Sequence, residues 1–186
     1  MNPEDHLPDP VTRSSSPLNL RRAGIALGSN LGSRLRHLQE ARDLLRKLSA
    51  DDSIRQASIY QTEPVACPPN SPDFFNTVVE FDYAGTAHEL LDATQAIEFH
   101  LGRISSPERN SPRVIDVDIL YLGDERIDGE ILDLPHPRLT SRRFVLQPLA
   151  EIRPDLVLPG DQVSIAEHLL HLDSAEPPLV TVQASW

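Results

Sequence analysis

The sequence is short of cysteine and has no long apolar run. Cys67 is the only cysteine in 186 residues, which excludes an internal disulfide and any multi-cysteine metal site. No apolar stretch approaches the roughly 20 residues that cross a bilayer. The N-terminus carries Asp, Glu, Pro and Ser without an apolar core, unlike a secretory signal. We therefore expect a cytoplasmic protein with no membrane segment.

Positive charge is also scarce. There are 17 Lys and Arg residues and 28 Asp and Glu residues, which gives a net charge of −11. General nucleic-acid binding relies on Lys and Arg that neutralise phosphates, so this balance argues against it. Several arginines nevertheless gather in the second half, where they could bind a small polyanion or simply be solvated. They are Arg103, Arg109, Arg113, Arg138, Arg142 and Arg143.

The composition predicts one soluble domain with two extensions. Apolar residues make up 39% and charged residues 24%, and the length suffices for a single hydrophobic core. Residues 1–21 are polar and proline-rich, and we expect them to form a flexible extension. Residues 22–160 would form the domain. Residues 161–186 would be a C-terminal extension, packed on the domain or trailing from it.

Apolar periodicity predicts an α+β fold. Strands are expected at 24–28, 54–61, 74–83 and 115–122, and amphipathic helices at 35–48 and 86–101. Thr86 and Glu89 form a capping-box pattern at the start of the second helix. The order is the ferredoxin-like βαββαβ arrangement, an antiparallel sheet with helices on one face. C-terminal additions would follow, with a helix at 144–152 and another after Gly160.

The segment RVIDVDIL at 113–120 carries the strongest local signal. Asp116 and Asp118 are two positions apart on an expected strand, so they share one face while the intervening apolar residues face the core. Neighbouring carboxylates repel each other and usually need cations. Oxygen ligands beside a phosphate suit Mg²⁺, which takes only one or two protein carboxylates. An exposed strand face that happens to carry two aspartates remains an open alternative.

Other side chains could bind an anion or a flat ring. Arginine forks such as those of Arg103 and Arg113 bind phosphate oxygens bidentately, although surface solubility is the usual role of a single arginine. His136, held between two prolines, could donate to a phosphate, and Phe74 with Asn76 could stack on and bond a heterocycle. Incidental loop placement and sheet packing are the ordinary alternatives.

Common nucleotide and hydrolase motifs are missing. The GSNLG segment at 28–32 lacks the G-K-[ST] ending of a phosphate loop, so a tight strand-to-helix turn is the better interpretation. The dinucleotide fingerprint G-x-G-x-x-G and the nucleophile elbow G-x-S-x-G do not occur.

Five segments together resemble the 6-hydroxymethyl-7,8-dihydropterin pyrophosphokinase family, across about 135 residues from Gly24 to Pro159. They are ALGSNLG at 26–32, SIYQTEPV at 58–65, DFFNTVVEF at 73–81, PRVIDVDILYLG at 112–123 and LPHPRLTSRRFVLQPLAEI at 134–152. Each segment alone is moderately specific. Five in this order at compatible spacing are very specific.

The resemblance implies a folate-pathway enzyme that moves pyrophosphate from ATP to the pterin. Two Mg²⁺ ions on Asp116 and Asp118 would bridge the ATP phosphates while the pterin hydroxymethyl oxygen attacks the β-phosphorus in line, releasing AMP. By position, the resemblance assigns catalysis to Arg103, Arg113, Asp116 and Asp118; ATP binding to Gln95, Glu98, Arg103, Arg113, Ile119, His136 and Arg142; and pterin binding to Thr62, Val65, Phe74, Asn76 and Phe144. The expected partners are these two small molecules, bound by a monomer, with no nucleic acid.

Five positions depart from the familiar bacterial pattern. Asn110 stands where a tryptophan often closes over the pterin, and Ser105 and Ser106 replace basic residues of the same loop. Ile131 and Pro137 replace further nucleotide contacts. These changes predict weaker loop closure with an intact metal site.

Two other functions fit parts of the sequence. An inactive relative could hold a nucleotide or a pterin without reaction, but Arg113, Asp116, Asp118, His136 and Arg142 are all present, which argues against it. An RNA-recognition module shares the strand and helix order. The basic-aromatic RNP1 pattern is missing, and the negative charge opposes RNA binding.

Overall fold

The computed structural model of the chain describes residues 19–64, 67–104, 111–173 and 179–186. The expected N-terminal extension therefore lies almost wholly outside the described residues, as do Val65, Ser105, Ser106 and Asn110. The elements, in chain order, are β1 (Arg21–Ser29), α1 (Arg34–Arg46), β2 (Arg55–Gln56), β3 (Ile59–Thr62), β4 (Phe74–Tyr83), α2 (Ala87–His100), β5 (Asp116–Leu122), β6 (Ile127–Asp128), β7 (Asp133–Leu134), the 3-10 helix η1 (Leu139–Ser141), α3 (Arg143–Ile152), α4 (Ile165–Leu170) and β8 (Val180–Gln183).

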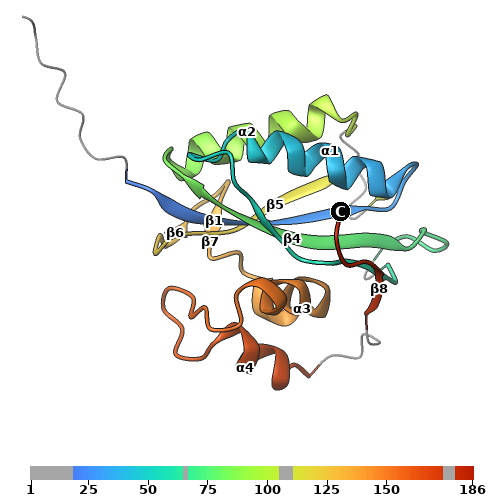
Figure 1. Cartoon of the computed structure of the whole chain (residues 1–186). Coiled ribbons are helices and arrows are strands. Elements are labelled where there is room, and N and C mark those ends of the chain that lie inside the picture. Colours follow the sequence, from blue (N-terminus) through green and yellow to red (C-terminus); the bar gives the residue numbers. More distant parts are fainter. Residues whose placement is uncertain (1–18, 65–66, 105–110, 174–178) are drawn as a thin grey trace, which may run out of the picture.

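The main sheet is antiparallel, as the sequence predicts. The strands run β5-β1-β4-β3-β8, with β2 pairing with β4, and every pairing is antiparallel. With α1 and α2 between these strands along the chain, the ferredoxin-like βαββαβ fold is confirmed (Figure 1). The expected strand at 54–61 is divided into β2 and β3, because its register against β4 shifts by one residue between Gln56, which pairs with Val79, and Tyr60, which pairs with Asn76.

Helices α1 and α2 cover one face of the sheet (Figure 1). Apolar side chains of α1 recur at helical spacing and pack on the sheet, led by Leu38, Ala41 and Leu45, none of which is exposed. The predicted capping box of α2 is present. Thr86 Oγ1 accepts from the Glu89 N–H at 3.2 Å, and the Glu89 carboxylate accepts from the Thr86 N–H at 2.7 Å. These bonds satisfy backbone donors that a helix start leaves unpaired.

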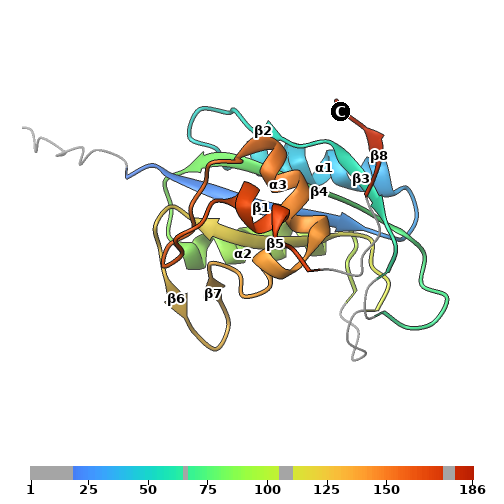
Figure 2. The same ribbon diagram turned by 90° about the horizontal axis from the view of Figure 1, so that it is seen from below.

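The opposite face of the sheet is covered by α3 and α4 (Figures 1 and 2). β4 is packed on both sides, since Val79 lies in the α1/α2 core while Val78 packs with Leu146 and Leu149 of α3. A second apolar sheet face cannot stay in water without cost, so the C-terminal additions supply a third layer. The sequence prediction placed helices on one face only and left the position of the additions open.

A bulge in β5 adjusts which side chains face α3. Gly24 pairs with Tyr121 and Ile25 with Ile119, so Leu120 is the extra residue. Leu120 and Tyr121 consequently both pack in the α3/α4 core, and Leu122 returns to the α1/α2 core. Before the bulge the strand alternates as predicted, with Asp116 and Asp118 on the α3 face.

The end of the chain returns to the sheet as β8, which pairs with β3. Beyond this strand, Trp186 packs against the α1/α2 core. Within the described ranges, no helix combines the length and apolar character that spanning a membrane requires.

Candidate functional site

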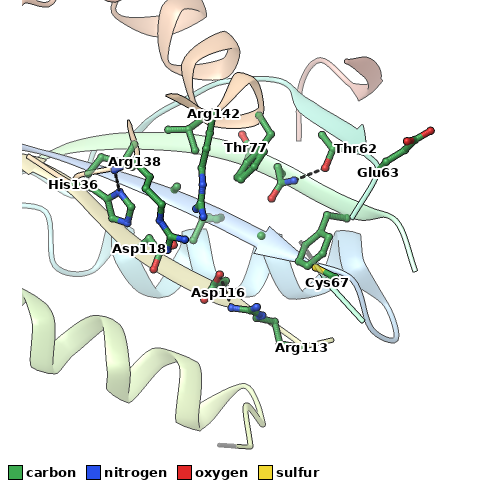
Figure 3. A pocket seen from close by; sticks show the side chains of 18 of the residues that line it. Thr62, Glu63, Cys67, Thr77, Arg113, Asp116, Asp118, His136, Arg138 and Arg142 are labelled. Carbon is green, nitrogen blue, oxygen red and sulfur yellow. Dashed lines mark hydrogen bonds and ion pairs between the residues drawn. The ribbon is translucent and has the colours of Figure 1, made fainter. Parts of the chain in front are cut away.

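A cleft of about 190 Å³ opens on the α3 face of the sheet. Its floor comes from β1, β4 and β5, and one wall comes from α3 and the segment before it. The lining side chains are polar at two ends (Figure 3): Asp116, Asp118, His136, Arg138 and Arg142 lie toward one end, and Thr62, Glu63 and Cys67 lie toward the other. The cleft thus brings together residues from six separate parts of the chain.

Most of the predicted site residues line this cleft. They are Thr62, Phe74, Asn76, Arg103, Arg113, Asp116, Asp118, His136, Arg142 and Phe144. Their convergence from β3, β4, β5, α3 and the connecting loops requires the folded topology, because they span more than 80 positions of sequence. Sequence reasoning therefore selected residues that the fold brings together.

Three residues predicted to bind ATP lie elsewhere. Ile119 is 4% exposed in the core beneath α1 and α2, and Gln95 is exposed on α2. Glu98 of α2 accepts from the Val117 N–H at 2.8 Å and forms an ion pair with Arg103. None of the three lines the cleft as it is described. Their nucleotide contacts, like that of Val65 with the pterin, stay predictions.

Two arginines neutralise Asp116. Arg103 Nη1 donates to one carboxylate oxygen at 2.7 Å, and Arg113 Nη1 donates to the other at 3.0 Å. Arg103 also contacts Glu98, so one guanidinium bridges two carboxylates. All four side chains are partly buried, which makes these charge-assisted bonds stronger than surface ion pairs.

Asp118 has a different environment. Burial, together with the negative charges of Asp116 and Glu98, raises its pKa to about 7, against the opposing charges of Arg103 and Arg142. The surroundings of Asp118 therefore stabilise its ionised form less well than water does. Within the described residues, no group of three or more His, Cys, Asp and Glu could hold a metal. Two carboxylates that leave room for water and phosphate oxygens fit Mg²⁺, which demands few protein ligands.

His136 is fixed by two backbone contacts. Its N–H donates to the Leu120 carbonyl at 2.8 Å, and its ring Nδ1 accepts from the Arg138 N–H at 3.1 Å (Figure 3). Burial lowers the His136 pKa, and the charges of Arg142 and Arg138 lower it further. A neutral ring whose Nδ1 accepts must carry its proton on Nε2. His136 can therefore donate one hydrogen bond without carrying charge.

The other end of the cleft combines an amide with aromatic rings. Asn76 is 8% exposed, and its Nδ2 donates to Thr62 Oγ1 at 2.6 Å. Phe74 precedes it by two positions on β4. The ring of Phe144 lies under the Arg142 guanidinium, 5.3 Å from carbon Cζ to the ring centroid. Such a combination suits a flat heterocycle with a polar edge.

Several lining residues were missed by sequence reasoning. Ala26 and Gly28 of β1 lie inside the quoted ALGSNLG segment, but a small residue carries no chemistry of its own to mark it. Arg138 lies two residues after His136 in the quoted PHPR segment, and it appeared only as one of the clustered arginines. Its position two residues from His136, a predicted phosphate ligand, could have indicated that Arg138 lines the cleft.

Comparison with known proteins decides the family. The family model described as 7,8-dihydro-6-hydroxymethylpterin-pyrophosphokinase (HPPK) matches residues 24–154, well over half of the chain. The chain belongs to the HPPK family. The 2-amino-4-hydroxy-6-hydroxymethyldihydropteridine pyrophosphokinase of Bacillus subtilis is 45% identical over 130 residues, 70% of this chain and 77% of that protein. The Pseudomonas aeruginosa enzyme of the same name is 38% identical over 158 residues, 85% of this chain and 93% of that protein.

Bifunctional proteins also contain an HPPK region. Wild-type Plasmodium falciparum HPPK-DHPS, solved with pterin and p-hydroxybenzoate, matches the fold with a TM-score of 0.64 at 15% identity. The match covers 84% of this chain and 44% of that chain. The folate synthesis bifunctional protein of Pisum sativum is 43% identical over 128 residues, 69% of this chain and 24% of that protein. This chain therefore corresponds to less than half of either bifunctional protein.

The predicted family is thereby confirmed, together with its pyrophosphokinase activity in folate biosynthesis. No comparison favours the inactive relative considered from the sequence. The metal, the nucleotide contacts and the roles of individual HPPK residues stay predictions.

Proposed function

We propose that this cleft binds ATP and 6-hydroxymethyl-7,8-dihydropterin side by side and transfers the pyrophosphoryl group between them. The observation that carries the proposal is the division of the cleft into an end with carboxylates and arginines and an end with an amide and aromatic rings. A triphosphate suits the first end and a pterin suits the second. The pterin alcohol would then meet the β-phosphorus where the two ends join.

Asp116 and Asp118 would hold the metal, as two Mg²⁺ ions between the carboxylates and the ATP phosphates. The raised pKa of Asp118 supports this assignment, because a cation would compensate the buried negative charge. When bound, the ions would neutralise charge that develops on the phosphate oxygens and align the attacking and leaving groups.

Arg103 and Arg113 would change partners when substrate binds. Both donate to Asp116, and a cation on Asp116 would compete with them for its oxygens. Their guanidinium forks would then bind phosphate oxygens, and Arg142 would contribute a third guanidinium. This exchange would also widen the cleft, whose 190 Å³ is below the roughly 300–1,000 Å³ of typical small-molecule sites.

His136 would donate from Nε2 to an α-phosphate oxygen. Because the Arg138 N–H occupies Nδ1, the ring is oriented before the nucleotide arrives. A donor held in place costs little reorganisation as charge builds on the leaving AMP.

The pterin would lie against Phe74 and Phe144 with its polar edge toward Asn76. Since Asn76 Nδ2 is already bonded to Thr62, its carbonyl oxygen is the group left to accept from the ring. Aromatic side chains contribute stacking area, and the amide fixes the orientation of the ring.

A product assay tests the proposal directly. The purified chain is incubated with ATP, Mg²⁺ and 6-hydroxymethyl-7,8-dihydropterin, and nucleotide and pterin products are separated by anion exchange. We expect AMP and the pterin pyrophosphate in equal amounts, and neither when EDTA replaces Mg²⁺. A pterin with a methyl group in place of the hydroxymethyl group is the control, because it has no attacking oxygen. Binding of both ligands without AMP formation would identify an inactive relative and end the proposal.

We also propose that the chain works as a monomer in the cytoplasm. Residues of a single chain supply both ends of the described cleft, so catalysis needs no second copy. Sedimentation velocity at the protein concentration of the assay tests the first point, and fractionation of cells that express the chain tests the second.

A further inference from the structure

The strand β1 lies between the two halves of the cleft. In the sheet, Gly28 pairs with Asp116 of β5 on one side and with Asn76 of β4 on the other. Ala26 likewise pairs with Asp118 on one side and Val78 on the other. The β1 residues that pair with the carboxylates and the amide, Ala26 and Gly28, are therefore both small.

Gly28 leaves no space for a side chain. A Cβ at this position would lie 2.7 Å from Asn76 Oδ1, 3.7 Å from Phe74 Cδ1 and 3.8 Å from Asp116 Cβ. The first distance is shorter than real contacts allow, so the Asn76 amide rests directly on the Gly28 backbone. Asn76 cannot move aside freely, because its Nδ2 is bonded to Thr62 Oγ1.

Backbone conformation does not account for this glycine. Gly28 lies within a regular strand and is not among the glycines with positive φ, which are Gly32, Gly102, Gly123 and Gly160. Any L-residue could adopt its conformation. The contact with Asn76 is thus the physical reason that the position requires a hydrogen atom in place of a side chain.

We propose that Gly28 is a specificity-determining residue of the pterin half of the cleft, which rests on the proposed function. The absence of a side chain lets the Asn76 amide pack against the Gly28 backbone, where Thr62 holds the amide nitrogen and the carbonyl oxygen is presented as a fixed acceptor. An acceptor in this place selects a flat ring that offers an N–H donor at its edge. Gly28 acts through Asn76 and is therefore a positioning residue, not a catalytic one.

Gly28→Ala tests the inference by ligand affinity. We expect pterin affinity to fall about tenfold or more, since a displaced fixed acceptor leaves its partner donor unpaired. Affinity for a non-hydrolysable ATP analogue with Mg²⁺ should stay unchanged, because the added Cβ would lie 3.8 Å from Asp116 Cβ, an ordinary van der Waals contact that displaces nothing. Calorimetric titration of each ligand separately gives the two affinities.

Gly24→Ala is the matched control. It adds the same methyl group to the same strand, but against the Tyr121 ring in the α3/α4 core instead of the cleft. We expect it to lower the melting temperature while leaving the ratio of pterin to ATP-analogue affinity as in the wild type. An equal loss of pterin affinity in both variants would overturn the inference.

A double-mutant cycle with Asn76→Ala keeps the inference testable if Gly28→Ala folds poorly. Removal of the amide vacates the space that the added methyl group needs. Gly28→Ala should therefore lower the melting temperature of the ligand-free protein less in the Asn76→Ala background than alone. Equal losses in both backgrounds would overturn the inference. If wild type itself formed no AMP, the proposed function would fail instead, and this cycle would still report on the Gly28–Asn76 contact.

Discussion

At the residue scale, Asp116 and Asp118 are chemically alike but electrostatically different. Asp116 accepts hydrogen bonds from two arginines, at 2.7 and 3.0 Å. For Asp118, burial and the nearby negative charges outweigh the arginines, and the pKa rises to about 7. One aspartate therefore stabilises the fold in the absence of a cation, whereas the ionised form of the other opposes it.

We predict that Asp118→Asn raises stability while removing activity. A carboxyl whose pKa is higher in the folded than in the unfolded state favours folding while protonated. Wild-type stability should therefore fall as the pH rises from about 4 through about 7, the range between its ordinary value and the raised one. Asp118→Asn avoids this fall. With EDTA present, its melting temperature should be a few degrees higher than that of wild type at about pH 8, and the same as that of wild type at about pH 4.

Asp116→Asn is the matched control for this prediction. Its amide cannot hold both arginines, so it should lower the melting temperature at about pH 8. Both variants should lose most AMP formation, because each removes a proposed Mg²⁺ ligand. If the two substitutions shifted the melting temperature in the same direction, the contrast between the two carboxylates would be wrong.

At the element scale, the sequence predicted what local pattern controls. Period-two alternation placed Asp116 and Asp118 on one face, and the Thr86–Glu89 pair placed the start of α2, because each signal lies within a few residues. The break at Ser58 was not predictable in the same way. Its N–H is bonded to Glu151 of α3 at 2.9 Å, a partner 93 positions away.

The candidate site was predictable in residues but not in arrangement. Charged and aromatic side chains can be recognised by their chemistry, so Arg113, His136 and Phe74 could be selected from the sequence. The role of Gly28 depends on its register with Asn76, which only strand pairing reveals. Likewise the apolar stripe of 144–152 predicted a helix, while the face it covers depends on Val78 and Leu120 from distant strands.

A buried carboxylate joins α3 to the sheet. Glu80 of β4 is fully buried, and Tyr121 Oη donates to it at 2.8 Å. Arg153, just after α3, lies 3.5 Å from one Glu80 oxygen, and Arg22 of β1 lies 3.6 Å from the other. Burial raises the pKa of Tyr121, and the charge of Glu80 raises it further, which keeps the hydroxyl a donor.

We predict that Tyr121→Phe lowers the free energy of unfolding by about 1–3 kcal/mol, because Glu80 stays buried and loses its short hydrogen bond. Urea unfolding followed by circular dichroism measures this cost. The loss should be smaller in a Glu80→Gln background, where no charge is left unsatisfied. An identical loss in both backgrounds would mean that the hydroxyl acts through packing alone.

At the scale of the whole molecule, the last described segment connects the layers. After α4 on one face, the chain continues to β8 at the sheet edge and ends beside α1 on the other face (Figure 1). Trp186 Nε1 donates to the Ala57 carbonyl at 2.9 Å, and Arg42 of α1 stacks 4.8 Å above the indole ring. Gln56 and Arg42 both donate to the Trp186 carbonyl.

This segment also bears on the cleft, because β8 pairs with β3 and β3 ends at Thr62. We call the contacts of Trp186 the anchor of this segment. Removing the anchor should loosen β8 first and then β3, because the edge of β3 loses its backbone hydrogen bonds when β8 leaves it. We predict that Trp186→Ala lowers the free energy of unfolding by about 2 kcal/mol, roughly half the cost of truncating a fully buried aromatic residue.

Hydrogen exchange distinguishes a local role of this anchor from a general loss of stability. In Trp186→Ala, protection of the β1 and β5 backbone amides should fall only as far as the free energy of unfolding falls. The backbone amides of β3 and β8 should lose more protection than that. Trp186→Phe preserves the stacking on Arg42 but not the bond to Ala57, so its effect should be intermediate. Uniform acceleration across all strands would show that Trp186 contributes to the core without anchoring the edge. Selective acceleration at β3 would show that the end of the chain stabilises the strand that carries Thr62 into the pterin half of the cleft.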